Sequence, residues 1–361
     1  MGVSKVSEYQ LATFIACSIS ANGIMIFREM FRIGKQDAWF SYLLPMLYAI
    51  LLVMVTVYIL KGEQTENLLQ LNKKLFGIFG GSLANFLVSI YTLFLIGLEV
   101  SKLANTIKYY LLPKTPLPIL VITLVLTIAY LAHAGIEVIL RFGNLVFIPY
   151  ALAIFILPFL LFNEIEVSNL LPIATNDLKH MVQESFSQFA LFGEVLLFLI
   201  LLGNTSKKQI SKHALVRGTI LGAFLLTFIC VLTIISVGVP ITSNAYLAPI
   251  FLVQLVHIAE FMDRFDLFLF STWFLCYLIR IVFFYFLLCS SISLIGKEDK
   301  YNKEYAILLI PLVSIVSLVF FQSEIRIFNF EKFPWQIFTF GFQFLLLGGL
   351  LLKKWTRRSV L

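Results

Sequence analysis

Four ionisable residues interrupt long apolar stretches of this sequence, and they are the first candidates for chemistry. Glu99 and Lys102 lie three residues apart, Glu194 follows a glycine, and Arg280 has apolar residues on both sides. A charged side chain within a membrane span is costly, so such residues usually pair with one another and mark functional sites. Arg280 needs a carboxylate or carbonyl partner, and Glu194 and Glu99 are the candidates.

Three of these residues also have structural interpretations. Glu99 and Lys102 share one helix face, where they either pair with each other or extend toward the outer interface of the membrane. Extension to the interface is the preferred interpretation for these two. Glu194 alternatively opens a helix, with its charge close to the helix N-terminus. Arg280 reaches an interface less easily, because apolar residues flank it on both sides.

The first apolar stretch is interrupted near its middle by Ser18, Ser20, Ala21, Asn22 and Gly23. Glycine and asparagine are poor helix formers, and a helix break bares backbone groups that must be satisfied inside the protein. A ligand with a carboxylate and an ammonium would satisfy them, and the following half-helix would favour the carboxylate. An unbroken helix whose small residues pack closely against a neighbour is an equally compatible interpretation.

The elements that position these residues are membrane helices. Apolar residues make up 60% of the 361 residues and charged residues 13%, whereas a soluble domain carries about 25% charged residues. This composition excludes a water-soluble globule and intrinsic disorder. About 20 mostly apolar residues cross a bilayer, and ten stretches qualify: 9–32, 39–60, 80–107, 117–134, 143–162, 184–203, 217–238, 265–292, 304–321 and 335–352. We predict an all-α integral membrane protein that forms a single membrane domain over 1–361.

Charge indicates the orientation of these spans. With the N-terminus inside, basic residues such as Lys73, Lys207 and Lys353 accumulate on the inner side, so both termini are predicted to be cytoplasmic. The net charge of +7 reflects these loops and predicts no binding to nucleic acid. The segment 247–261 is too short to cross; it is either a helix in the outer interface or an extension of the eighth span.

Signatures of soluble enzymes and of metal sites are missing from the sequence. It contains no glycine-rich nucleotide loop and no H-E-x-x-H motif, and its four histidines show no ligand spacing. We therefore expect neither an enzyme nor a cofactor or metal site. Gly218 and Gly222, four residues apart in the seventh span, predict close packing against another helix.

The ten spans divide into two sets of five, at about 9–162 and 184–352. Gly193 and Glu194 interrupt the first span of the second set, as Asn22 and Gly23 interrupt the first span of the first set. Inverted repeats that each begin with a broken helix are typical of secondary transporters, whose substrates bind at the breaks.

Three segments resemble a known family. Gly34-Lys-Gln-Asp-Ala-Trp-Phe-Ser41 is similar to its Gly-x-Asp-Ala-Trp signature, and Phe192-Gly-Glu-Val-Leu-Leu-Phe-Leu199 to its Gly-Glu segment. Phe261-Met-Asp-Arg-Phe-Asp266, followed by Trp273, resembles its acidic-Arg-x-Asp motif. The family is the B subunit of the spore germinant receptors, the endospore germination permeases, which resemble the amino acid–polyamine–organocation transporters.

The resemblance implies a LeuT-type fold of two inverted five-helix repeats with broken helices 1 and 6. It implies a nutrient sensor in the inner membrane of the spore that recognises an amino acid, nucleoside or sugar and acts with A and C subunits. The ligand contacts carried over, some by position alone, are Ser20, Ala21, Asn22, Gly23, Ile24, Gly97, Val100, Ser187, Phe192, Gly193, Glu194, Tyr277 and Phe284.

The sequence departs from the family at Ala21, where the family has glycine, so the unwinding of helix 1 is expected to be smaller. Arg264, paired with Asp263 or Asp266, is expected to hold an outer loop. Three hypotheses remain: a sensing subunit, a cation- or proton-coupled amino acid permease with Glu194 or Glu99 as the titrating group, and an assembly protein with a vestigial pocket.

Overall fold

The chain folds into a bundle of helices, seen in a computed structural model that describes residues 7–60, 68–173, 178–198, 212–245, 247–256, 265–295 and 303–358. These residues contain no β-strand. The α-helices are α1 (Glu8–Gly23), α2 (Phe27–Gly34), α3 (Leu43–Leu60), α4 (Leu68–Tyr110), α5 (Leu117–His133), α6 (Ile136–Leu160), α7 (Leu178–Gly193), α8 (Lys212–Val237), α9 (Val239–Thr242), α10 (Ala248–Gln254), α11 (Phe265–Ile295), α12 (Tyr305–Leu308), α13 (Ile310–Phe320), α14 (Glu324–Lys332) and α15 (Pro334–Arg358).

Each of the ten predicted stretches coincides with helix, although part of the sixth lies outside the described residues. Among the described residues, six helical regions are long and apolar enough to cross a membrane, and one of them, Glu8–Tyr58, covers the first stretch and nearly all of the second. Tyr305–Phe320 and Glu324–Lys332 form a pair bent by 90°, and Leu117–His133 and Gln188–Phe198 are shorter apolar helices. The prediction of an all-α membrane protein is confirmed.

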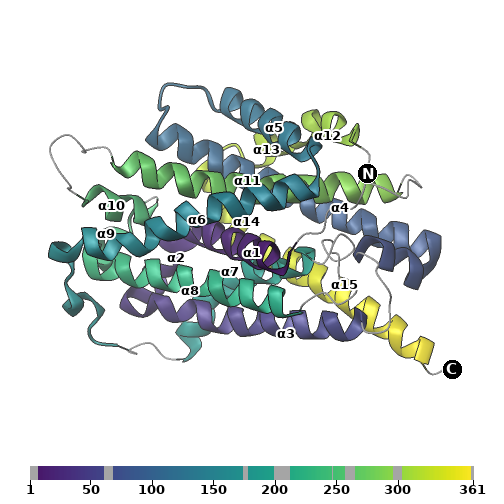
Figure 1. Cartoon of the computed structure of the whole chain (residues 1–361), viewed down its shortest axis with the longest axis horizontal. Coiled ribbons are helices and arrows are strands. Elements are labelled where there is room, and N and C mark those ends of the chain that lie inside the picture. Colours follow the sequence, from purple (N-terminus) through teal and green to yellow (C-terminus); the bar gives the residue numbers. More distant parts are fainter. Residues whose placement is uncertain are drawn as a thin grey trace.

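The longer helices lie side by side along the long axis of the molecule, with α9 and α10 at one end (Figure 1). Helix α11 is central: 89% of its apolar window is buried, and it packs against α1, α4, α5 and α6. Helix α4 contains Gly77 in a left-handed conformation (φ 77°), which divides it into a short first segment and a long second one. That long segment and α11 carry three of the four ionisable residues that interrupt the apolar stretches.

Helix α1 is held against α8 by the two glycines that the sequence singles out. A Cβ on Gly222 would lie 2.9 Å from Ile19 Cβ, and one on Gly218 would lie 2.6 Å from the carbonyl oxygen of Ala12. The absence of side chains at these two positions therefore lets the backbones approach. The predicted close packing is confirmed, and its partner is the helix that carries the first interruption.

Replacing Gly222 with leucine is expected to destabilise the protein by about 1–3 kcal/mol, because the new side chain overpacks the α1–α8 contact. Thermal melting of the purified protein in detergent measures this. Ile220→Leu is the matched control, since Ile220 is 45% exposed on the same helix. A melting temperature for Gly222→Leu equal to that of the control would show that α1 and α8 separate freely.

The segment predicted at 247–261 contains the separate short helix α10, which ends at Gln254. Residues 257–264 lie outside the described residues, so the predicted pairing of Arg264 with Asp263 or Asp266 stays a prediction.

Candidate functional site

Both predicted helix interruptions occur at a glycine, and both are changes of helix type. Helix α1 ends at Gly23 and continues through one 3₁₀ turn, Ile24–Ile26, into α2. Helix α7 ends at Gly193 and passes into a 3₁₀ turn over residues 194–198. Gly23 keeps ordinary helical dihedrals (φ −58°, ψ −29°). The interruption of helix 1 is therefore slight, and short 3₁₀ stretches within helices often mark hinges. Whether Ala21 makes the unwinding smaller than in relatives stays a prediction.

Side chains of α11 bind backbone carbonyl groups of α1 close to its interruption. The indole N–H of Trp273 donates to the carbonyl oxygen of Ala21 at 2.9 Å. The Nε of Arg280 donates to the carbonyl oxygen of Ser18 at 3.2 Å. The last four carbonyls of an α-helix have no partner four residues on, so the indole N–H satisfies one of the groups that the end of α1 releases.

Arg280 is completely buried and bridges two carboxylates. Its Nη2 donates to Oε2 of Glu194, and its Nη1 lies 3.5 Å from Oε2 of Glu99. Its guanidinium carbon lies 4.8 Å from the centroid of the Phe284 ring, a cation–π contact. Both partners predicted for Arg280 are confirmed, and the cation joins α11 to α4 and to the interruption of α7.

Lys102 extends this network toward α14. Its Nζ lies 3.5 Å from Oε1 of Glu99, donates to Oε1 of Glu331 at 2.8 Å, and donates to Oδ1 of Asn22 at 3.5 Å. The side chains of Lys102 and Glu99 are only 6% and 2% exposed. The preferred interpretation, that both extend to a membrane interface, is wrong: α14 folds over them and supplies a carboxylate.

Glu331 is the participant that the sequence analysis missed. It lies on α14, after the 90° bend that follows α13, in a segment that the sequence places between two spans. A charged residue in such a segment is ordinary, because charged residues normally face solvent. Only the fold of α14 back over α4 distinguishes Glu331 from other loop carboxylates.

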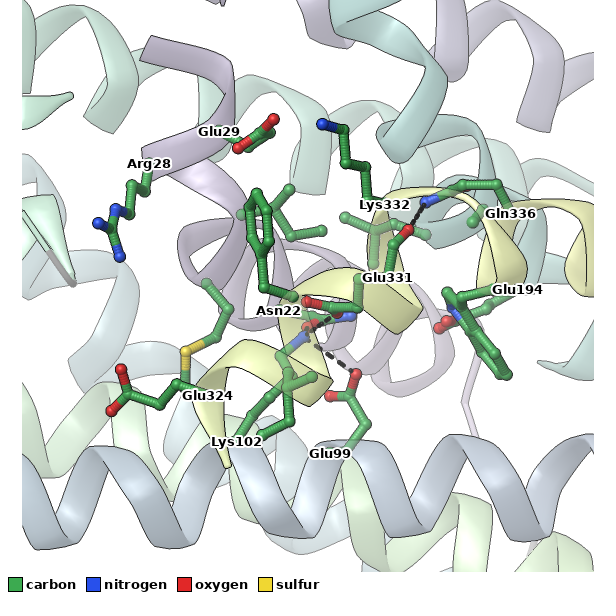
Figure 2. Close-up of a pocket in the computed structure, with 17 residues that line it drawn as sticks. Asn22, Arg28, Glu29, Glu99, Lys102, Glu194, Glu324, Glu331, Lys332 and Gln336 are labelled. Carbon is green, nitrogen blue, oxygen red and sulfur yellow. Dashed lines mark hydrogen bonds and ion pairs between the residues drawn. The ribbon is translucent and has the colours of Figure 1, made fainter. Parts of the chain in front are cut away.

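These residues surround a cavity of about 140 Å³ between the helix interruptions and α14. Asn22, Glu99, Lys102, Glu194 and Glu331 converge on it (Figure 2). The charged residues of its wall are Arg28, Glu29, Glu99, Lys102, Glu194, Glu324, Glu331 and Lys332. Five of these are acidic and three basic, and Arg280 lies behind the wall against Glu99 and Glu194, so the formal charge of the whole site is 4 − 5 = −1. A wall with both signs and a surplus of carboxylates suits a ligand that carries an ammonium group, alone or with a carboxylate.

The thirteen predicted contact residues are distributed around this cavity unevenly. Asn22 and Glu194 line it, whereas Ile24 lines a separate apolar cavity. The three glycines face other helices: a Cβ on Gly23 would meet Leu226, one on Gly97 would meet Val316, and one on Gly193 would meet Gln343. Buried outside the charged wall are Ser20, Ala21, Val100, Phe192, Tyr277 and Phe284. Ser187 lies on α7, and its side chain is not described. Their binding of ligand stays a prediction.

Replacing Glu331 with glutamine is expected to loosen α14 by about 1 kcal/mol, because the partly exposed pair with Lys102 loses its charge. This corresponds to about fivefold faster hydrogen exchange in α14, measured by mass spectrometry. Glu164→Gln, the same change at an exposed carboxylate outside α14, is the control and should leave exchange in α14 unchanged. Equal exchange in both variants would mean that Lys102 does not hold α14.

The sequence match decides the family. The model of the family described as "Spore germination protein" matches residues 5–326. The chain belongs to the spore germination protein family. This member is 26% identical over 272 residues to putative spore germination protein YfkT of Bacillus subtilis, a match that covers 75% of each chain. It is 24% identical over 238 residues to spore germination protein KB of Bacillus subtilis, over 64% of each chain.

The fold of this spore germination protein is similar to that of MHP1, a nucleobase–cation symport-1 family transporter solved in a closed conformation with bromovinylhydantoin bound. The TM-score is 0.61 at 14% sequence identity, over 87% of this chain and 71% of MHP1. The predicted LeuT-type transporter fold is confirmed. These likenesses support a multi-pass membrane protein of a permease or receptor family rather than an enzyme.

Proposed function

We propose that this protein is the ligand-binding B subunit of a spore germinant receptor, and that a small nutrient binds in the charged cavity. One observation carries the proposal: in a spore germination protein, both helix interruptions meet a largely buried charged network at one cavity. The network comprises Asn22, Glu99, Lys102, Glu331, Glu194 and Arg280, with Arg280 linking Glu194 to Glu99. Buried charges are costly unless each has a partner, and they are typical of binding and coupling sites in membranes.

The charge of the cavity selects among nutrient classes. With a formal charge of −1 once Arg280 is counted, and with Glu331 free of that cation, the cavity favours an amino acid or another amine over a neutral sugar or nucleoside. The ligand's ammonium would compete with Lys102 for Glu331, and a ligand carboxylate would compete with Glu331 for Lys102. Either exchange changes how α14 is held to α4.

Ligand binding would then act by shifting a conformational equilibrium. A ligand can do this only if it binds one conformer more tightly than the other. Rearrangement of α14 and of the 3₁₀ turn at Ile24–Ile26 provides two such conformers. The chain would pass this bias to A and C subunits in the inner membrane of the spore, with both termini cytoplasmic. We also propose that the fold consists of two repeats, at about 9–162 and 184–352.

The test is a germination screen of a strain that lacks the gene, measured as the fall in spore optical density. Wild-type complementation should restore the response to one nutrient class, and the amines and amino acids are expected to be the active ones. A strain whose nutrient responses are all unchanged by the deletion would overturn the proposal.

A second candidate function, a cation- or proton-coupled amino acid permease, is supported by the similarity of the fold to MHP1. Uptake of labelled amino acids into proteoliposomes distinguishes the two. Gradient-driven accumulation by the isolated chain supports the permease, whereas saturable binding without accumulation supports the sensing subunit.

A further inference from the structure

A second, larger cavity lies on the other side of the interrupted first helix. It measures about 370 Å³, is open on one side, and is bordered by η1 (Ile24–Ile26), α4, α6, α8, α10 and α11. Its volume falls within the roughly 300–1,000 Å³ that is usual for small-molecule sites, whereas the charged cavity is smaller. Short helix α10, at one end of the bundle (Figure 1), contributes Pro249, Ile250 and Val253 to its wall.

The wall of this cavity is chemically unlike that of the charged cavity. None of the described residues that line it is charged. Aliphatic and aromatic side chains, including Ala153, Ile154 and Phe270, make up most of the wall, and Tyr150 and Gln254 contribute polar groups. An ion without a partner pays a large desolvation cost in such a place. The cavity therefore suits a neutral molecule with an aromatic ring or a branched apolar group.

The two cavities share the interruption of helix 1. Ile24 lines the apolar cavity, and Asn22, two residues earlier, lines the charged one. Trp273 also lines the apolar cavity, and its indole N–H donates to the carbonyl oxygen of Ala21, in the last turn of α1. A molecule that packs against Ile24 and Trp273 thus contacts the same turn whose other side faces Lys102.

We propose that the apolar cavity is a second binding site, for a neutral aromatic or branched apolar small molecule, and that it is coupled to the charged cavity through the turn at Ile24–Ile26. The coupling is reciprocal by thermodynamic linkage: if occupancy of the apolar site changes affinity at the charged site, the reverse holds by the same factor. The binding part of this inference stands even if the proposed sensing role fails.

The experiment uses 5-fluoroindole as probe and the full chain purified in nanodiscs, with binding measured by broadening of the fluorine NMR signal. We expect saturable binding to the wild type that neutral indole displaces and zwitterionic tryptophan does not. Ala153→Phe, which places a ring in the cavity from α6, should weaken binding at least tenfold. Ile250→Trp fills the same space from α10 and should do the same.

Leu152→Phe is the matched control, since Leu152 is 56% exposed on the neighbouring position of α6, and it should bind as the wild type does. Thermal melting shows whether each variant is folded. Coupling is read separately by hydrogen exchange. The probe should slow exchange in peptides that cover residues 18–30 in the wild type and in Leu152→Phe, and should not slow it in Ala153→Phe. Undiminished binding in both filled variants, equal displacement by tryptophan, or a co-purified phospholipid that the probe cannot displace would overturn the assignment.

Discussion

Replacing Arg280 with alanine is expected to lower the free energy of unfolding by about 3–5 kcal/mol, because it leaves buried carboxylates without their cation. Glu194 suffers most, since its carboxylate is 5% exposed and is bound by Arg280, whereas Glu99 keeps Lys102. A loss of this size is a large share of the roughly 5–15 kcal/mol that stabilises a typical domain. The expected result is a sharp fall in the amount of folded protein in the membrane fraction.

Two further variants make this result specific. Arg280→Lys keeps the charge, but an ammonium lacks the planar fork of a guanidinium and cannot reach both carboxylates and the Ser18 carbonyl at once. The free energy of unfolding of this variant should lie between those of Arg280→Ala and the wild type. Arg141→Ala removes a surface ion pair in which the side chain of Arg141 is 60% exposed and that of Glu137 is 37% exposed. This change should lower the free energy of unfolding by less than about 1 kcal/mol. Normal abundance and melting of Arg280→Ala would show that Arg280 reaches water.

Replacing Ala190 with phenylalanine is expected to abolish ligand binding in the charged cavity while the fold survives. Ala190 is 2% exposed and lines the cavity from α7, one turn before Glu194. A ring at this position occupies much of a space of about 140 Å³. We expect the nutrient concentration for half-maximal germination to rise at least ~100-fold, which corresponds to about 2.8 kcal/mol of lost binding.

The control for this variant is Leu152→Phe, which introduces the same ring on the exposed face of α6. Receptor abundance is measured in both strains by immunoblotting of spore membranes. An unaltered response from Ala190→Phe at normal abundance would mean that the nutrient binds elsewhere. Gly23→Trp, a natural choice from the sequence, is a poorer test: Gly23 faces Leu226 of α8, so a large side chain would separate α1 from α8.

The helices and the partners of Arg280 were predictable from the sequence for the same physical reason. Hydrocarbon demands about 20 apolar residues in each span and tolerates an arginine only if a carboxylate or carbonyl group meets it. Few carboxylates interrupt the apolar stretches, so Glu194 and Glu99 were evident. The glycines at positions 23 and 193 also marked both interruptions, because glycine disfavours the helix interior.

The wall of the cavity was not predictable, because all-round apolar spans do not reveal which face meets which neighbour. The sequence therefore pointed to Gly97 and Gly23, which face Val316 and Leu226. The sequence also favoured a position at a membrane interface for Lys102. The spacing of nearby residues does not reveal the 90° bend that brings α14 and Glu331 over Lys102.

The amino-acid sequence by itself determined that the chain lies in a membrane, where its helices lie along the chain, and which buried charges must find partners. Only the tertiary structure decided which side chains share a cavity. Apolar content and helix propensity act on neighbouring residues along the chain, whereas a binding site is assembled from segments as distant as Asn22, Lys102 and Glu331, whose meeting depends on how whole helices pack.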